Sequence, residues 1–157
     1  MTWYYKDVEV TELPDDTVGF VYIITCLPTG RRYVGKKLGK FTKTKIKTIT
    51  FKNGTKKKKK IREKVDSDWR DYYGSSDALL SDVATLGVDQ FKREIIYFCL
   101  SKSACSYLEA KLQFQYNVLE SDDWYNNNIM IRVHGNHIRD KKIDRKSTRL
   151  NSSHVKR

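Results

Sequence analysis

The earliest continuous apolar run of the chain, residues 20–26, is rich in β-branched and aromatic side chains. A short run of this kind predicts a strand that is buried on both faces. Pro28 and Gly30 mark a turn after it, because proline presets φ and glycine tolerates a positive φ. Residues 31–35 then resemble a returning strand, so the pattern predicts an antiparallel hairpin.

From Ser75 onward the spacing of apolar residues becomes helical. Between residues 79 and 86, leucine and valine recur at the i, i+1, i+4 and i+7 positions of one helix face. Ser75 or Ser76 is available to cap the N-terminus of this helix, and Gly87 is placed to end it. We therefore expect a first helix in this region.

Three further elements follow along the chain. Residues 91–99 predict a third strand, residues 103–119 predict a second helix, and residues 129–133 are a candidate for a last strand. The strands and helices mix without a regular strand–helix alternation, so we expect an α+β fold. Its expected core is a small three- to four-stranded mixed or antiparallel sheet flanked by helices.

Positive charge is concentrated in a basic insertion, residues 36–64, directly after the predicted hairpin. This segment holds 14 Lys or Arg residues against one acid, Glu63, in a chain whose net charge is +12. Such a density repels itself unless a polyanion neutralises it, so nucleic acid is the first partner to consider. The open alternative is a solvated loop that aids solubility. Asn53-Gly54 suits a two-residue type I′ turn, which would make part of the insertion a basic β-arm.

The apolar and cysteine content points away from membranes and disulfides. No apolar run approaches the length needed to cross a bilayer, and no apolar signal-type region follows the N-terminus. Cys26, Cys99 and Cys105 are odd in number and lack metal-type spacing. We therefore expect buried, reduced thiols in a cytoplasmic protein. Nothing in these patterns indicates the oligomeric state.

The last residues, 144–157, differ from the rest of the chain. They lack apolar periodicity and resemble one reading frame of a common sequencing adapter. We therefore expect a non-native, adapter-derived tail here. It carries five basic residues and one acid, so the remainder of the chain stays strongly basic.

Two tripeptides carry a resemblance to a known family. Phe20-Val21-Tyr22, then ten residues, then Tyr33-Val34-Gly35 resembles the signature of the GIY-YIG nucleases, although the first tripeptide lacks the usual Gly and Ile. Three later segments resemble a phage-encoded branch, some of whose members are homing-type endonucleases: Tyr72-Tyr73-Gly74-Ser75-Ser76, Phe91-Lys92-Arg93-Glu94-Ile95 and Leu108-Glu109. The resemblance covers about residues 19–133 and implies an endonuclease that hydrolyses phosphodiester bonds in DNA.

This interpretation places a geometric condition on the two tyrosines. If the numbers of paired hairpin residues sum to 57, Tyr22 lies opposite Gly35, and Tyr33 is its diagonal neighbour on the same face, roughly 7–8 Å away. A three-residue loop with a glycine bulge would change that sum by one and put the tyrosines on opposite faces. The nuclease interpretation therefore requires the odd register.

The resemblance also implies roles for individual residues. Tyr22 would act as general base or water-orienting group, and Tyr33 would hold the attacking water or the phosphate. Glu109 would be the sole metal carboxylate, suited to Mg²⁺ or Mn²⁺ with substrate oxygens and water as the other ligands. Asn126 would support the site, although neighbouring asparagines make that choice open.

Positive charge is needed at such a site for two purposes. A phenol with an ordinary pKa of roughly 10 is a poor base, so we expect cations of the hairpin to lower the Tyr22 pKa. The candidates are Arg31, Arg32, Lys36 and Lys37. The arginine that grips the scissile phosphate is either Arg62 or Arg70, and Lys36 could share this role. The lysines expected to bind DNA are Lys37, Lys40, Lys56, Lys57, Lys58, Lys59 and Lys60.

The expected organisation is a single nuclease domain with short flanks. A lead-in spans residues 1–18, the domain spans 19–133 with its insertion at 36–64, and a C-terminal segment spans 134–143. If the chain is phage-encoded, its location is the cytoplasm of the host cell. Two alternatives remain: a non-catalytic basic module that binds nucleic acid, and a repair-type DNA nickase.

Overall fold

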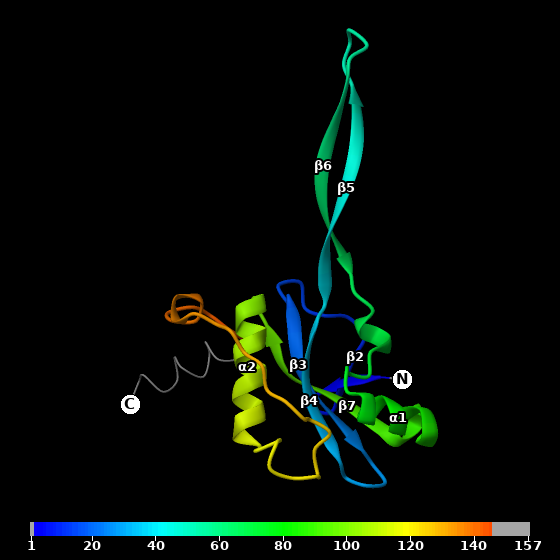
Figure 1. The fold of residues 1–157 in the computed structure, drawn as a ribbon, viewed down its shortest axis with the longest axis vertical. Coiled ribbons are helices and arrows are strands. Elements are labelled where there is room, and N and C mark those ends of the chain that lie inside the picture. Colours follow the sequence, from blue (N-terminus) through cyan, green and yellow to red (C-terminus); the bar gives the residue numbers. More distant parts are fainter. Residues whose placement is uncertain (1, 146–157) are drawn as a thin grey trace.

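A five-stranded mixed sheet forms the body of the protein in the computed structural model, which describes residues 2–145 (Figure 1). Its strand order is β2-β1-β7-β3-β4. The strands are β1 (Trp3–Tyr5), β2 (Val8–Val10), β3 (Gly19–Cys26), β4 (Arg32–Leu38) and β7 (Phe91–Cys99). Only the β1–β7 pair is parallel. The α+β class with a mixed sheet is confirmed, and the sheet gains two strands because β1 pairs with β7 and β2 pairs with β1.

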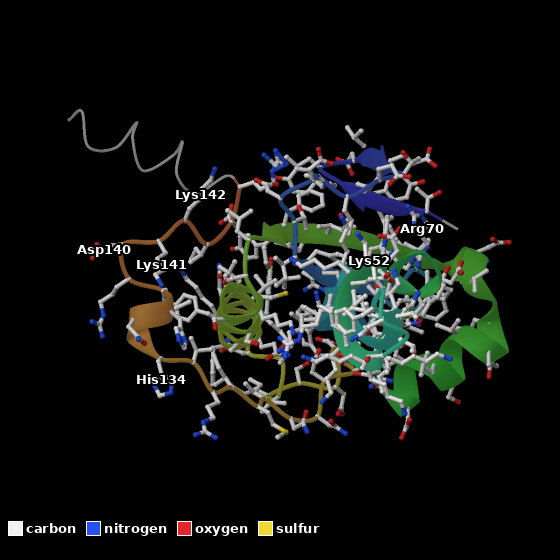
Figure 2. The ribbon with its side chains drawn as sticks, turned by 90° about the horizontal axis from the view of Figure 1, so that it is seen from above. Lys52, Arg70, His134, Asp140, Lys141 and Lys142 are labelled. Atoms are coloured by element: carbon white, nitrogen blue, oxygen red, sulfur yellow. The ribbon has the colours of Figure 1, made fainter. Side chains whose placement is uncertain are left out.

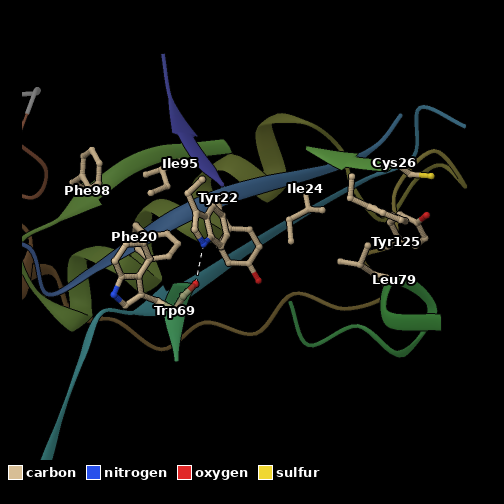
Figure 3. Packing of buried hydrophobic residues seen from close by; sticks show 11 residues of the cluster. Phe20, Tyr22, Ile24, Cys26, Trp69, Leu79, Ile95, Phe98 and Tyr125 are labelled. Carbon is tan, nitrogen blue, oxygen red and sulfur yellow. Dashed lines mark hydrogen bonds between the residues drawn. The ribbon is translucent and has the colours of Figure 1, made fainter. Parts of the chain in front are cut away.

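The two faces of the sheet are covered by different helices. The helix α1 (Asp77–Leu86) contributes Leu79 to the apolar cluster on one face, and α2 (Lys102–Gln115) contributes Leu108 to the cluster on the other. Successive residues of β3 alternate between these clusters, so this strand is buried on both faces as predicted. Figure 3 shows the first cluster, with Tyr22 among its aromatic and aliphatic side chains.

The β3–β4 hairpin has the odd register that the nuclease interpretation requires. Tyr22 pairs with Gly35, and Ile24 pairs with Tyr33. The loop is closed by backbone hydrogen bonds from Cys26 to Arg31 and from Gly30 to Cys26, with Gly30 at a φ of 78°. Residues 27–30 therefore make a four-residue loop, which preserves the odd sum and leaves both tyrosines on one face.

The ends of the helices show where local sequence signals succeed and where they fail. The Ser76 hydroxyl caps α1 by accepting from the Leu79 N–H, and Gly87 ends the helix with a φ of 91°, as predicted. The helix α2 ends at Gln115, so its predicted extension to residue 119 is wrong. Asn117 adopts a left-handed φ of 55°, and the Val118 N–H turns back to the Gln113 carbonyl.

The basic insertion forms a long two-stranded arm that projects from the body (Figure 1). Its antiparallel strands are β5 (Lys40–Thr50) and β6 (Lys56–Asp66). The predicted hairpin is confirmed, but the predicted two-residue type I′ turn is wrong. Phe51 still bonds to Thr55, which leaves a three-residue loop with Gly54 at a φ of 86°. Such a loop is a type I turn completed by a left-handed glycine.

The candidate strand at residues 129–133 is also wrong, since these residues have no strand pairing in the structure. The free edge of β4 that could have received a strand is occupied by the preceding segment. Trp124 bridges to Arg32, and the Asn126 side chain bonds to Val34. The competition for this edge is a tertiary effect that hydrophobic pattern does not reveal.

Three further observations concern the ends of the chain and its bulk properties. In the predicted tail, Asp144 bridges to Cys99 and Arg145 contacts Asp16 at 3.3 Å, while residues 146–157 lie outside the described part. The three cysteines are free and buried, as expected. Neither α-helix within residues 2–145 has the length and apolar character to cross a membrane.

Candidate active site

Tyr22 and Tyr33 stand on one face of the hairpin, above a position that only glycine can occupy. Their ring centroids are 6.2 Å apart. A Cβ at Gly35 would overlap the Tyr22 hydroxyl, and would come within 2.6 Å of the Tyr22 Cζ and 2.8 Å of the Tyr33 Cε2. The absence of a side chain at Gly35 therefore lets both tyrosine rings pack against the backbone of the hairpin.

A third tyrosine, Tyr72, completes an aromatic cluster around these phenols. Its ring packs edge-on against Tyr22, with centroids 6.1 Å apart, and it helps to raise the pKa of the Tyr22 hydroxyl. Gly74 follows at a φ of 91°, and a Cβ there would lie 3.3 Å from the Tyr33 ring. The segment that connects the arm to α1 is thus folded over the two signature tyrosines.

Buried Arg93 holds that connecting segment in place. Its guanidinium donates to the backbone carbonyls of Arg70 and Tyr72, at 2.9 Å each. It also stacks on Trp3 and Tyr73, at 4.6 and 4.3 Å from the ring centroids. Burying a cation that is only 1% exposed costs free energy unless it is hydrogen-bonded. The bonds of Arg93 meet this requirement, and one of them holds the backbone of Tyr72 in position.

The two signature tyrosines differ in exposure and in proton affinity. Tyr22 is 1% exposed, and burial followed by the neighbouring Tyr72 and Tyr33 raises its pKa well above the ordinary value. Tyr33 is half-buried and hydrogen-bonds with the Ser75 hydroxyl at 3.2 Å; burial raises its pKa too, although this hydrogen bond lowers it. The expectation that hairpin cations lower the Tyr22 pKa is wrong, because burial and the neighbouring phenols raise it and so favour the protonated phenol.

Glu109 reaches this site from α2, at the edge of β4 that faces away from β3. Its carboxylate lies close enough to the backbone N–H of Lys36, next to Gly35, for that N–H to affect its pKa. Burial raises the Glu109 pKa, and the Lys36 ammonium and N–H oppose that rise. The carboxylate also raises the pKa of both Tyr22 and Tyr33, so the three side chains share one electrostatic environment.

Asn126 and Gln113 occupy the same edge of β4, one step along the strand. Asn126 accepts from the Val34 N–H at 3.0 Å and donates to the Val34 carbonyl at 2.8 Å, as a neighbouring strand would. The Gln113 amide, one helical turn after Glu109, donates to the same carbonyl at 3.4 Å. Glu109, Gln113 and Asn126 therefore lie along one edge of the β3–β4 hairpin.

The two arginine candidates lie outside the tyrosine cluster. Arg62 is exposed on β6, paired with Thr44 within the arm. Arg70 lies beside the base of the arm, where its guanidinium contacts Glu12 at 3.2 Å and Asp66 at 3.8 Å. Viewed along the arm, Arg70 lies on the opposite side of α2 from the C-terminal residues His134 and Asp140 (Figure 2).

Two lysines, Lys37 and Lys36, lie next to residues of the site. The Lys37 ammonium lies 4.1 Å from the centroid of the Tyr72 ring and 2.6 Å from an Asp68 carboxylate oxygen. Lys36 is exposed and donates to the Ser106 hydroxyl at 2.6 Å, beside Glu109 on α2. Successive residues of a strand point to opposite faces, so Lys37 lies on the tyrosine face and Lys36 on the α2 side.

The other expected cations are placed as follows. Arg31 donates to the Asp122 carbonyl at 2.8 Å and stacks on Tyr125, and Arg32 stacks on Trp124 at 4.3 Å, so both hold the segment that caps β4. The lysines expected to bind DNA lie at the base of the arm and along β6: Lys40, Lys56, Lys57, Lys58, Lys59 and Lys60.

An open polar cleft of about 720 Å³ lies next to the tyrosine cluster. It is lined by the first residues of α1, by Arg31 and Asn126, and by Ser75, which hydrogen-bonds with Tyr33. The site tyrosines and Glu109 do not line the cleft themselves, so Ser75 is the link between the cleft and Tyr33.

The donor set at this site limits which metal could bind. Among residues 2–145, no group of three or more His, Cys, Asp or Glu side chains could hold an ion. Glu109 therefore offers one carboxylate, which suits Mg²⁺ or Mn²⁺ because these ions take most of their oxygen ligands from water and phosphate. A site for zinc, which requires several protein ligands, does not fit this donor set.

Several residues of the site were not assigned a role from sequence alone. Three of them, Tyr72, Arg93 and Gly74, lie within segments that carry the family resemblance, and that resemblance could have identified them. The sequence pointed less strongly to Gln113, which follows Glu109 at i+4 on the same helix face.

One comparison with known proteins gives a match. The family model described as "Putative endonuclease segE, GIY-YIG domain" matches residues 3–129. This range includes β1, the arm, Glu109 and Asn126. No curated protein and no solved structure matches the chain.

Proposed function

Because the chain belongs to the GIY-YIG nucleases, which are phosphodiester hydrolases, we propose that it is a Mg²⁺-dependent DNA endonuclease with its centre at Tyr22, Tyr33 and Glu109. The observation that carries this proposal is the odd register of the hairpin, which places both tyrosines on one face beside Gly35. The Glu109 carboxylate acts electrostatically on both phenols from the edge of the same strand.

The protonation states favour distinct roles for the two tyrosines. Tyr22 holds its proton, so it orients the attacking water or a phosphate oxygen by donating a hydrogen bond, and does not remove a proton itself. Tyr33 is half-buried, and its hydroxyl bonds to Ser75, which lines the cleft; from there it can contact the scissile phosphate. Glu109 would hold Mg²⁺ or Mn²⁺, and the ion would supply positive charge against the phosphate and make the attacking water more acidic.

The phosphate also needs cations from the protein, and Lys37 and Lys36 are the best placed. Lys37 lies over the Tyr72 ring on the tyrosine face, and Lys36 lies beside Glu109. Their charge opposes the negative charge that builds up on the phosphorus oxygens in the transition state. Arg70 and Arg62 would contact DNA away from the scissile bond.

The basic arm supplies the remaining attraction for DNA. Its exposed lysines can neutralise phosphates and release counterions, a sequence-independent source of affinity. A phage-encoded, homing-type role in the cytoplasm of a host cell belongs to the same proposal and rests on the segments that resemble that branch of the family.

A second candidate function is a nucleic-acid-binding module without catalysis. Two observations favour it: Tyr22 is 1% exposed, and neither arginine candidate lies in the tyrosine cluster. Such a module would bind DNA strongly at low salt but leave phosphodiester bonds intact.

Conversion of supercoiled plasmid distinguishes the two functions. The purified chain is incubated with plasmid in Mg²⁺, in Mn²⁺ or in EDTA, while binding is followed in parallel by gel shift. A nuclease produces nicked or linear DNA only with the metals. Binding without any conversion in either metal would refute the nuclease proposal and support the binding module.

A further inference from the structure

The arm has two faces of different chemistry, because directly paired residues of an antiparallel ribbon project to the same side. The register is continuous from Lys40↔Asp66 to Thr50↔Lys56. One side, which we call the threonine–cation face, carries hydroxyls from β5 and a row of cations from β6. Its members are Thr44, Thr48, Thr50, Lys56, Lys58, Lys60, Arg62 and Lys64.

On the opposite side of the arm, which we call the isoleucine face, neighbouring side chains partly cover two isoleucines. Ile49 and Ile61 are half-buried there, although they lie on a two-stranded ribbon that stands away from the body. Long lysine stems can cover apolar neighbours in this way. Glu63 forms an ion pair with Lys45 at 3.1 Å on this face, while the other lysines of the face are Lys43, Lys47, Lys57 and Lys59.

The threonine–cation face is exposed and suits the floor of a DNA groove. All the members named above are exposed, and Ile46, which shares the face, is 67% exposed. Short hydroxyls permit close approach and can hydrogen-bond with any base, and an apolar side chain can contact a thymine methyl group. The β6 cations recur at every second residue, about 6.6 Å apart, which is about two base-pair steps of one DNA strand.

The dimensions of the arm also fit the major groove. Each strand has 11 residues, which corresponds to a length of about 36 Å. The major groove of B-DNA is about 12 Å wide and accepts a two-stranded β-ribbon, whereas the minor groove is about half as wide. The arm projects from the body with both faces accessible along most of its length (Figure 1).

The base of the arm is tied to the strand that carries the active site. β5 begins two residues after β4 ends, and the Ser67 N–H and hydroxyl, just after β6, bond to the carbonyls of Gly39 and Leu38. Lys37 and Asp68 pair across the same junction. The position of the arm on DNA therefore determines where the duplex meets Tyr33.

We propose that the arm enters the major groove of the substrate duplex with its threonine–cation face toward the bases. This inference rests on DNA being the substrate, as in the proposed function, but it does not require cleavage. The arm is then the element through which the chain can distinguish base pairs, in addition to contributing charge.

Two matched triple variants test which face meets the DNA. K56Q/K58Q/K60Q removes three charges from the threonine–cation face, and K47Q/K57Q/K59Q removes three from the isoleucine face at a similar height on the arm. Affinity for a labelled mixed-sequence duplex longer than the arm is measured in EDTA over a range of salt concentrations. Because no cutting is needed, failure here is separate from failure of the nuclease proposal.

The proposal predicts a large difference between the two variants. Loss of three lysine charges inside the groove, where they neutralise the flanking phosphates, should weaken binding by about ten-fold or more and reduce the salt slope by about 2.7, at roughly 0.9 per neutralised phosphate. The isoleucine-face variant should lose less than half as much on both measures. Equal losses, or a larger loss from the isoleucine face, would overturn the orientation.

Groove-specific competitors test the groove itself. Methyl green, which occupies the major groove, should displace the wild-type chain from the duplex, whereas netropsin, which occupies the minor groove, should not. Displacement by netropsin alone, by both ligands or by neither would overturn insertion into the major groove.

Discussion

Tyr22 and Gly35 face each other across the β3–β4 hairpin, and the Tyr22 phenol occupies the space that a side chain at position 35 would need. The glycine of the second signature tripeptide is therefore a steric requirement of the first tripeptide's tyrosine. Tyr33 lies against the same position, so one missing side chain sets the place of both phenols.

Replacing Gly35 with alanine should disrupt the site. The new methyl group would force the Tyr22 ring out of its buried position, at a cost of about 1–3 kcal/mol in unfolding free energy, and cleavage should be lost. Urea unfolding and plasmid cleavage measure the two effects. In the double variant G35A/Y22F, the nearest atom is removed, so part of the stability should return; additive losses would contradict the steric explanation.

Lys37 and Arg70 should differ in their effect on cleavage. Lys37→Ala removes the cation next to Tyr72 and should lower the cleavage rate by about 100-fold. Arg70→Ala should stay within a few-fold of wild type, because that guanidinium contacts Glu12 and Asp66 away from the tyrosines. Single-turnover rates at saturating enzyme compare the variants. A greater loss from Arg70→Ala would reverse the assignment.

Glu109 should make stability depend on pH. Burial raises its pKa above the ordinary value of 4.5, so the folded protein binds this proton more tightly than the unfolded chain does. The resulting stabilisation is present below that ordinary value and is lost as pH rises through the folded pKa. Glu109→Gln lacks this loss, so its melting temperature relative to wild type should increase from about pH 4 to about pH 8 in EDTA. A constant or falling difference would contradict the raised pKa.

Asn126 should matter for stability through its two bonds to Val34. Asn126→Ala leaves a buried N–H and carbonyl on the edge of β4 without their shared partner, which should cost about 1–3 kcal/mol in urea unfolding. The adjacent Asn127 is exposed, and Asn127→Ala should change stability by less than about 0.5 kcal/mol. Equal effects from the two substitutions would argue against the edge-capping role.

Local sequence signals predicted the elements well where one residue controls the backbone. Ser76 and Gly87 delimit α1, and residues 20–35 form the hairpin with its tyrosines 11 positions apart. The register could only be stated as a condition, because it depends on the loop at residues 27–30, which several turn types could have closed.

The rest of the site depended on contacts between distant segments. Tyr72 reaches Tyr22 only because buried Arg93 holds its backbone, and the edge of β4 is capped from α2 and from residue 126. Of the cations proposed from sequence for the site, Lys37 and not Arg62 lies against Tyr72, because the insertion carries Arg62 into the arm. The hydrophobic periodicity of the sequence does not reveal these contacts between distant segments.

The most direct test of a nuclease centre at Tyr22, Tyr33 and Glu109 is the single-turnover rate of Mg²⁺-dependent plasmid cleavage by wild type and by Glu109→Gln. The substitution keeps the size of the side chain and an acceptor for the Lys36 N–H, but removes the charge. Cleavage should fall by about 1,000-fold or more, while affinity for the same DNA changes by less than about three-fold. Cleavage by Glu109→Gln at near the wild-type rate would contradict the proposed site.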